Sequence, residues 1–122
     1  MTQRRNYIVE YFDLVQDVNA TLIMSQIHYW YMPGKNGKSK LRVQKNGNFW
    51  ISKSYIDWWN EVRLNRRQVD RALKVLIDAN LIKVQLFKFD GSPTRHIRCE
   101  VLDSVPIEMR DSMDIVGAFT VP

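Results

Sequence analysis

Basic and amide side chains are concentrated in one short segment, LNRRQVDRALK, which runs from Leu64 to Lys74. Such cations can neutralise phosphates, and arginine or glutamine side chains can make paired hydrogen bonds to guanine or adenine edges. The chemistry that this segment favours is therefore the binding of DNA. The residues that we predict to contact DNA are Asn65, Arg66, Arg67, Gln68, Asp70, Arg71 and Lys74. The competing interpretation is a solvated, salt-bridged helix face that has no partner.

The acidic residue of this set, Asp70, needs a separate explanation. On a helix it can pair with Arg66 or Lys74, four positions away, or with Arg67, three positions away. Its carboxylate could instead accept a hydrogen bond from a cytosine amine. We favour the ion pair, because pairs at this spacing are common on exposed helices.

Further cations lie on either side of this segment. Six basic residues and no acidic residue occur between Lys35 and Lys53. They can either grip a DNA backbone or be merely solvated. From the flanking regions we add four residues to the predicted DNA-binding set: Lys53, Lys88, Arg95 and His96. A hydrogen-bonded surface histidine without a ligand is an equally good interpretation of His96.

The rest of the sequence does not predict catalysis or a cofactor. His28 lies among aromatic residues and is typical of a core or boundary histidine, and two histidines with one cysteine do not assemble a metal site. The glycines and lysines of GKNGKSK do not have the spacing of a phosphate-binding loop. The sequence also shows no paired carboxylates and no Ser-His-Asp set. We therefore expect a protein that is not an enzyme and has no cofactor.

The composition is that of a folded domain with a basic body. The 122 residues are 45% hydrophobic, which is enough for an ordinary core in a single domain. The formal charge is +5, and because residues 103–122 contain four acids and one base, residues 1–102 carry +8. Such a charge favours an anionic partner. The lone cysteine, Cys99, and the lack of an apolar run of about 18 residues favour a cytoplasmic protein.

The DNA-binding segment is expected to lie on a helix that starts after Asn65 and ends at Asn80. Asn65 and Gln68 have the spacing of a capping box, and Asn80 can take the left-handed conformation that ends a helix. Apolar side chains recur along this segment at helical spacing. Those that we predict to face the core are Val69, Ala72, Leu73, Leu76 and Ile77.

Elements on the N-terminal side are expected to position this helix. The spacing predicts a helix over residues 17–32, a basic loop over 33–45 and a short strand through 49–51. A second helix should follow Ser52 as its N-cap and end near Glu61. We expect Tyr55, Ile56 and Trp59 to be buried on that helix. The segment YIVEYFDLV, residues 7–15, fits either a strand or a helical turn.

On the C-terminal side, alternating apolar residues predict a β-hairpin. Val84 and Leu86 alternate with polar residues before the turn, and Ile97, Cys99 and Val101 do so after it. The turn itself is expected at DGSP, residues 90–93.

The order of these elements describes a winged helix-turn-helix domain. The predicted fold class is therefore α+β, with three main helices, a small antiparallel β-sheet and a hairpin wing. We assign residues 1–102 to this domain and residues 103–122 to an acidic C-terminal tail or a short docking helix. Trp58 and Trp59 cannot both face one core, so one of them should cover another part of the protein or a partner.

Three stretches resemble the winged-helix domains at the N-terminus of phage and plasmid replication initiators of the replisome-organiser type. They are ATLIMSQIHYW, FWISKSYIDWWNEVRLNRRQVDRALKVLIDANLI and GSPTRHIR. The resemblance runs from about Asn19 to Arg98 and implies DNA binding through the helix that starts at Asn65. Two features depart from that family, which usually has glycine where this chain has Arg63 and usually continues into a longer chain.

We therefore expect a protein that binds double-stranded DNA in phage or plasmid replication initiation or in transcription regulation. The alternative is a phage-encoded protein-interaction module or inhibitor that binds a host nucleic-acid enzyme on a winged-helix scaffold. A host or replisome protein and a second copy of the chain are the protein partners that we consider. Tyr29 to Met32 is a candidate dimer surface. No membrane partner is expected.

Overall fold

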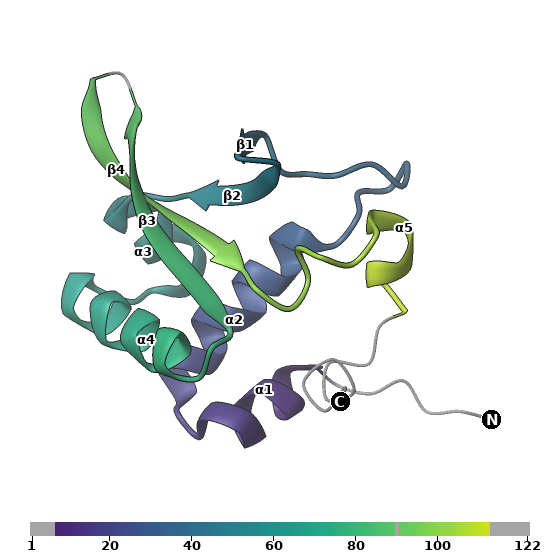
Figure 1. The fold of residues 1–122 in the computed structure, drawn as a ribbon. Helices are drawn as coiled ribbons and strands as arrows, with labels where there is room; N and C mark the ends of the chain where they lie inside the picture. The colour runs from purple at the N-terminus through teal and green to yellow at the C-terminus, as the bar shows by residue number, and fades with distance from the viewer. Residues whose placement is uncertain (1–6, 90, 113–122) are drawn as a thin grey trace.

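The computed structural model describes residues 7–89 and 91–112 of the chain. These residues form an α+β fold of five helices and one four-stranded antiparallel sheet (Figure 1), which confirms the predicted α+β class. In chain order the elements are α1 (Tyr7–Val15), α2 (Val18–Tyr31), β1 (Val43–Lys45), β2 (Asn48–Ser52), α3 (Tyr55–Val62), α4 (Arg66–Asp78), β3 (Ile82–Phe89), β4 (Ser92–Cys99) and α5 (Ile107–Arg110).

The sheet has the strand order β1-β2-β4-β3, and the β3–β4 hairpin is its longest part. Val84 lies opposite Ile97 in the hairpin, and Ile51 of β2 pairs with Ile97 from the other side. Figure 1 shows α2 and α4 on one side of the sheet, with the far end of the hairpin extending beyond them. The predicted hairpin is therefore confirmed, and it projects from the body of the protein. Its turn is shorter than predicted, because Ser92 and Pro93 pair with β3, and Val101 lies beyond the end of β4 at Cys99.

Helix α4 packs its apolar face against α2 and β3. Val69, Ala72, Leu73 and Leu76 are buried as predicted, whereas Ile77 is 41% exposed. At 100° per residue, Ile77 lies about 80° around the helix from Val69, at the edge of the apolar stripe. The stripe predicted from the sequence is therefore correct except at this position.

Local signals account for most of the helix ends. The carboxylate of Asp17 accepts a hydrogen bond from the amide of Ala20 at 2.8 Å and caps α2, whose bounds agree within a residue with the prediction. Asn80 has a φ of 62°, the left-handed conformation expected after α4. Residues 7–15, for which the sequence left two possibilities, form the helix α1.

The second helix begins two residues later than predicted. Ser52 stays in β2, where it pairs with His96, and Ser54 caps α3 in a capping box with Asp57. The buried face of the helix also differs from the prediction. Trp58 is fully buried, while Ile56 and Trp59 are 72% and 49% exposed. The predicted burial of Ile56 and Trp59 is therefore wrong, although the expectation that the two tryptophans face different surroundings is confirmed.

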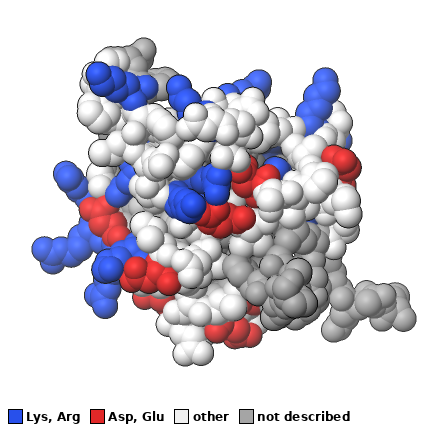
Figure 2. Space-filling model, viewed as in Figure 1, with Lys and Arg blue, Asp and Glu red and all other residues white. Residues whose placement is uncertain are grey.

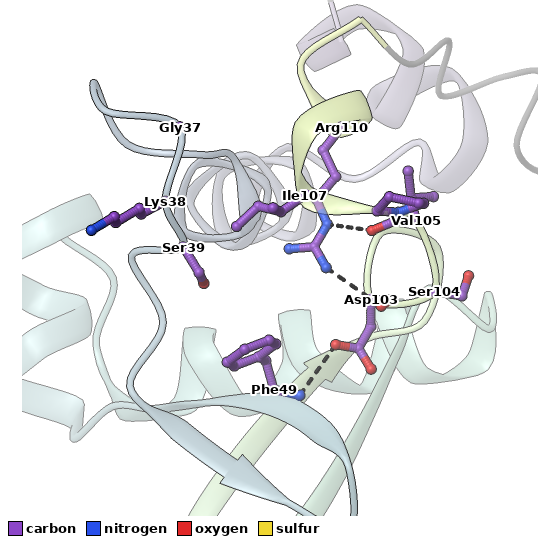
Figure 3. A pocket seen from close by; sticks show the side chains of 10 residues that line it. Gly37, Lys38, Ser39, Phe49, Asp103, Ser104, Val105, Ile107 and Arg110 are labelled. Atoms are coloured by element: carbon purple, nitrogen blue, oxygen red, sulfur yellow. Dashed lines mark hydrogen bonds between the residues drawn. The ribbon is translucent and has the colours of Figure 1, made fainter.

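Residues 103–112 fold back onto the body of the protein. Arg110 is buried, and its guanidinium donates hydrogen bonds to the carbonyl oxygens of Val105 at 2.9 Å and Tyr31 at 3.1 Å. Figure 3 shows Arg110 beside an open pocket, facing Asp103, which accepts a hydrogen bond from the amide of Phe49. Within the stretch predicted as an acidic tail or a short docking helix, residues 107–110 form α5, and residues 113–122 lie outside the described part of the chain.

His28 holds α1 against α2. Its ring is buried, stacks on Tyr7 with the ring centroids 4.0 Å apart, and places Nδ1 2.8 Å from the hydroxyl oxygen of Tyr11. The loss of solvation on burial lowers the pKa of His28 to about 4; Asp111 opposes this effect and Lys40 adds to it. The interpretation of His28 as a core or boundary histidine is confirmed.

We expect the free energy of unfolding to fall by about 2 kcal/mol between pH 7 and pH 5 through His28. Because its folded-state pKa lies below the ordinary 6.5, its contribution is complete above that pH and is lost as the pH falls towards 4. Chemical denaturation at both pH values, with the wild type and with His28→Gln, measures the effect. Glutamine can bond to Tyr11 without titrating, so an equal loss in both proteins would contradict this role for His28.

Candidate nucleic-acid interface

The start of α4 is fixed by a capping box. The side chain of Asn65 accepts a hydrogen bond from the amide of Gln68, and the side chain of Gln68 accepts one from the amide of Asn65, both at 2.9 Å. This confirms the predicted helix start. It also occupies both side-chain oxygens, so in this conformation Asn65 and Gln68 are engaged in positioning the helix.

Arg63 forms the left-handed end of α3, directly before this cap. Its φ is 58°, and its amide donates a hydrogen bond to the carbonyl oxygen of Trp59 at 2.9 Å. The guanidinium donates to the carbonyl oxygens of Trp59 and Asn60 at 2.7 and 3.2 Å. These side-chain bonds help a non-glycine residue to hold the strained conformation, in which the Cβ atom costs about 1 kcal/mol.

The outward face of α4 is rich in exposed arginine. Arg66, Arg67 and Arg71 are all exposed, and none of them has a carboxylate oxygen within 4 Å in the described part of the chain. Arg66 lies over the ring of Tyr55 at 4.9 Å, and Lys74 pairs with Asp78 at 3.2 Å on the solvent side. The unpaired guanidinium groups are therefore available to anions in solution.

Asp70 links α4 to the hairpin. Its Oδ1 accepts hydrogen bonds from the hydroxyl of Tyr55 at 2.7 Å and from the guanidinium of Arg95 at 2.9 Å. The predicted pairing of Asp70 with cations of its own helix is therefore wrong, since its ion-pair partner comes from β4. Partial burial favours protonation, but the hydrogen bonds from Tyr55 and Arg95 and the charges of Arg95 and Arg66 outweigh it and lower the pKa of the Asp70 carboxyl.

The hairpin adds cations on the same side as α4. Leu86 lies opposite Arg95, and Lys88 lies opposite Pro93. Because side chains alternate along a strand, these residues share a face with Val84 and Ile97, whose side chains turn towards the helices. Lys88 and Leu86 are both exposed on this face, beyond the part of the hairpin that packs on the core.

Two predicted binding residues lie inside the protein. His96 is 1% exposed, its Nδ1 lies 2.8 Å from the carbonyl oxygen of Thr94, and its ring packs edge-on against Phe87. The surface position expected for His96 is therefore wrong. The side chain of Lys53 is 8% exposed and pairs with Glu61 at 2.6 Å, so neither residue is presented beside α4.

Tyr55 is the residue of this site that the sequence did not reveal. As predicted, it packs against the core, although it is only partly buried. Its hydroxyl donates to Asp70, and its ring lies under the guanidinium groups of Arg66 and Arg95, each 4.9 Å from the ring centroid. The sequence gives only a weak indication of this role, namely an aromatic residue near the start of the helix that precedes an arginine-rich helix. The contacts of Tyr55 could not be predicted, because its partners come from two other elements, α4 and β4.

The basic loop is separate from this surface. Figure 1 places the chain between α2 and β1 beside α5, at the opposite end of the molecule from α4. Within that loop Lys40 lies over the ring of Tyr29 at 3.8 Å. Figure 2 shows Lys and Arg side chains at the left edge, over α4, with acidic side chains among them, and further cations over the far end of the hairpin and at the upper right of the view. The structure therefore places the cations of α4 and the hairpin on one surface, and the cations of the basic loop on another.

The described residues contain no group of three or more His, Cys, Asp or Glu side chains arranged to hold a metal ion. In the same part of the chain, no helix combines the length and apolar character needed to cross a membrane. No family model, curated protein or solved structure matches this chain.

Proposed function

We propose that this protein is a winged helix-turn-helix protein that binds double-stranded DNA. In this proposal α3 and α4 are the helix pair, the three residues 63–65 are the turn between them, and the β3–β4 hairpin is the wing. A helix that projects in this way has the right width for the major groove, and a wing beside it can follow the DNA backbone.

The observation that carries the proposal is the exposed arginine face of α4, continued by the hairpin. Arg66, Arg67 and Arg71 have no carboxylate oxygen within 4 Å among the described residues, and Asp70 holds Arg95 of the hairpin beside them. The carboxylate of Asp70 thus orients Arg95 of β4, although it also adds one negative charge to this surface. Because Asn65 and Gln68 are used in the helix cap, direct readout of bases would fall to Arg67 and Arg71.

The biological role that we propose is phage or plasmid replication initiation or transcription regulation in the cytoplasm. This role rests on the resemblance of residues 19–98 to replisome-organiser domains. Either role needs a protein that recognises duplex DNA, so the binding test below applies to both.

A second candidate is a phage-encoded protein-interaction module or inhibitor that binds a host nucleic-acid enzyme. It is favoured by apolar side chains exposed on α1 and at the start of α2, where Val9 is 53%, Phe12 41% and Val18 64% exposed. Val9 and Phe12 are three residues apart and share one face of α1, and contiguous apolar patches mark protein interfaces. The same surface would also serve a homodimer or a replisome partner.

The proposal is tested by fluorescence anisotropy of a labelled random duplex at several salt concentrations. Each phosphate contact contributes about −0.9 to the slope of log K against log salt. On a random duplex, where Arg67 and Arg71 contact phosphates instead of specific bases, we expect a slope of about −3.6 from Arg66, Arg67, Arg71 and Lys88. Absence of binding at the lowest salt concentration would contradict the proposed function and favour the second candidate.

A further inference from the structure

Trp59 is an exposed aromatic side chain that the packing of α3 does not require. Its neighbour Trp58 is fully buried and fills the core, whereas Trp59 is 49% exposed. Ile56, three residues earlier on the same face of α3, is 72% exposed. Helix α3 therefore presents an apolar stripe to solvent beside the turn that leads into α4.

A guanidinium group is held next to this tryptophan. Arg63 lies over the Trp59 ring at 5.7 Å, and its hydrogen bonds to the carbonyl oxygens of Trp59 and Asn60 keep it there. The nearest acid along the chain, Glu61, is occupied elsewhere, because its carboxylate accepts hydrogen bonds from Gln26 and Lys53. The positive charge of Arg63 thus has no carboxylate within 4 Å in the described residues.

We propose that the face of the Trp59 ring that Arg63 does not cover is a stacking surface for an unpaired nucleobase, and that Arg63 attracts the phosphate of that nucleotide. Base stacking on aromatic side chains depends little on sequence, and arginine strengthens it. Arg66 of α4 lies over the ring of Tyr55 at 4.9 Å, and Tyr55 is four residues before Trp59 on the same face of α3, so the proposed stacking surface lies next to the arginine face of α4. The protein therefore binds a junction between duplex and single-stranded DNA more tightly than it binds blunt duplex.

This inference rests on the proposed function, because α4 must hold the duplex part of the junction. The charges favour nucleic acid over a protein as the occupant of this surface. Arg63, Arg66 and Arg67 supply unpaired positive charge. The exposed acid nearest on α3, Asp57, is engaged in the capping box with Ser54.

The test compares three DNA probes of the same duplex: blunt, with an overhang of about six thymidines, and with an abasic overhang of equal length. The two overhangs carry the same phosphates, so their difference isolates the bases. We expect the wild type to bind the thymidine probe at least about fivefold more tightly than the abasic probe. In Trp59→Ala this preference should disappear while affinity for blunt duplex is unchanged, and in Trp59→Phe it should be partly retained.

Tyr29→Ala is the matched control, because Tyr29 is another half-exposed aromatic residue with a cation over its ring. Its preference should equal that of the wild type. Equal affinity of the wild type for the two overhangs, or a preference that survives in Trp59→Ala, would overturn the inference and leave Trp59 to a protein partner. The inference would also be overturned if Trp59→Ala lost as much affinity for the blunt duplex as for the thymidine probe. Wild-type protein that binds none of the probes would overturn the proposed function as well.

Discussion

Replacing Arg67 and Arg71 together by alanine is expected to weaken duplex binding by about 10- to 100-fold at moderate salt and to make the salt slope shallower by about two. Both side chains are exposed on α4 and have no carboxylate partner in the described part of the chain. When a guanidinium that contacts a phosphate is lost, about one counterion fewer is released on binding. When a guanidinium that contacts a guanine is lost, a pair of hydrogen bonds to that base is lost. Fluorescence anisotropy across a range of salt concentrations measures both quantities.

A control with the same loss of charge is available in the basic loop. Lys35 and Lys38 are exposed, and their loop lies beside α5, away from α4. Lys35→Ala with Lys38→Ala should change the affinity only slightly, through the net charge. If the two double variants lose affinity equally, overall charge and not the α4 surface governs binding. Circular dichroism should show that both variants keep the wild-type helix content.

Replacing Glu61 by alanine is expected to lower the free energy of unfolding by about 3 kcal/mol. The carboxylate of Glu61 accepts hydrogen bonds from Gln26 at 2.7 Å, Trp30 at 3.1 Å and Lys53 at 2.6 Å. Without Glu61 the ammonium of Lys53, whose side chain is 8% exposed, would remain in the protein without its counter-charge. Urea denaturation followed by tryptophan fluorescence measures the loss.

The partner variant Lys53→Met should cost much less, about 1 kcal/mol. Methionine keeps an apolar chain near Trp30 and Trp58, the rings that the Lys53 ammonium now faces at 4.4 and 5.8 Å. Glu61 would keep two hydrogen-bond donors and is more exposed than Lys53, at 22%. A cost for Lys53→Met as large as that for Glu61→Ala would contradict the view that the unpaired buried cation dominates.

Features that depend on neighbouring residues could be predicted from the sequence. The capping box of Asn65 and Gln68, the apolar stripe of α4 and the left-handed Asn80 arise from contacts within one helix or at its ends. The hairpin could also be predicted from local sequence, because a segment of alternating apolar and polar residues lies on each side of a turn. These elements carry most of the cations of the proposed interface.

Features that depend on contacts between distant segments could not be predicted. The choice between Ser52 and Ser54 as the N-cap of α3 depends on the pairing of Ser52 with His96 in β4. Asp70 finds Arg95 across 25 residues of chain, where the spacing within the helix favoured nearer partners. His96 is covered by an aromatic group that assembles when β2, β3 and β4 meet.

The central claim is that α4 and the hairpin form the surface that binds DNA, and amide chemical-shift mapping during titration with a short duplex tests it most directly. We predict that the largest shift changes fall on residues 66–74 and on the exposed part of the hairpin, around Leu86, Lys88 and Arg95. Amides of α1 and α5 should change little. Changes concentrated on α1 and the start of α2, with α4 unaffected, would contradict the account.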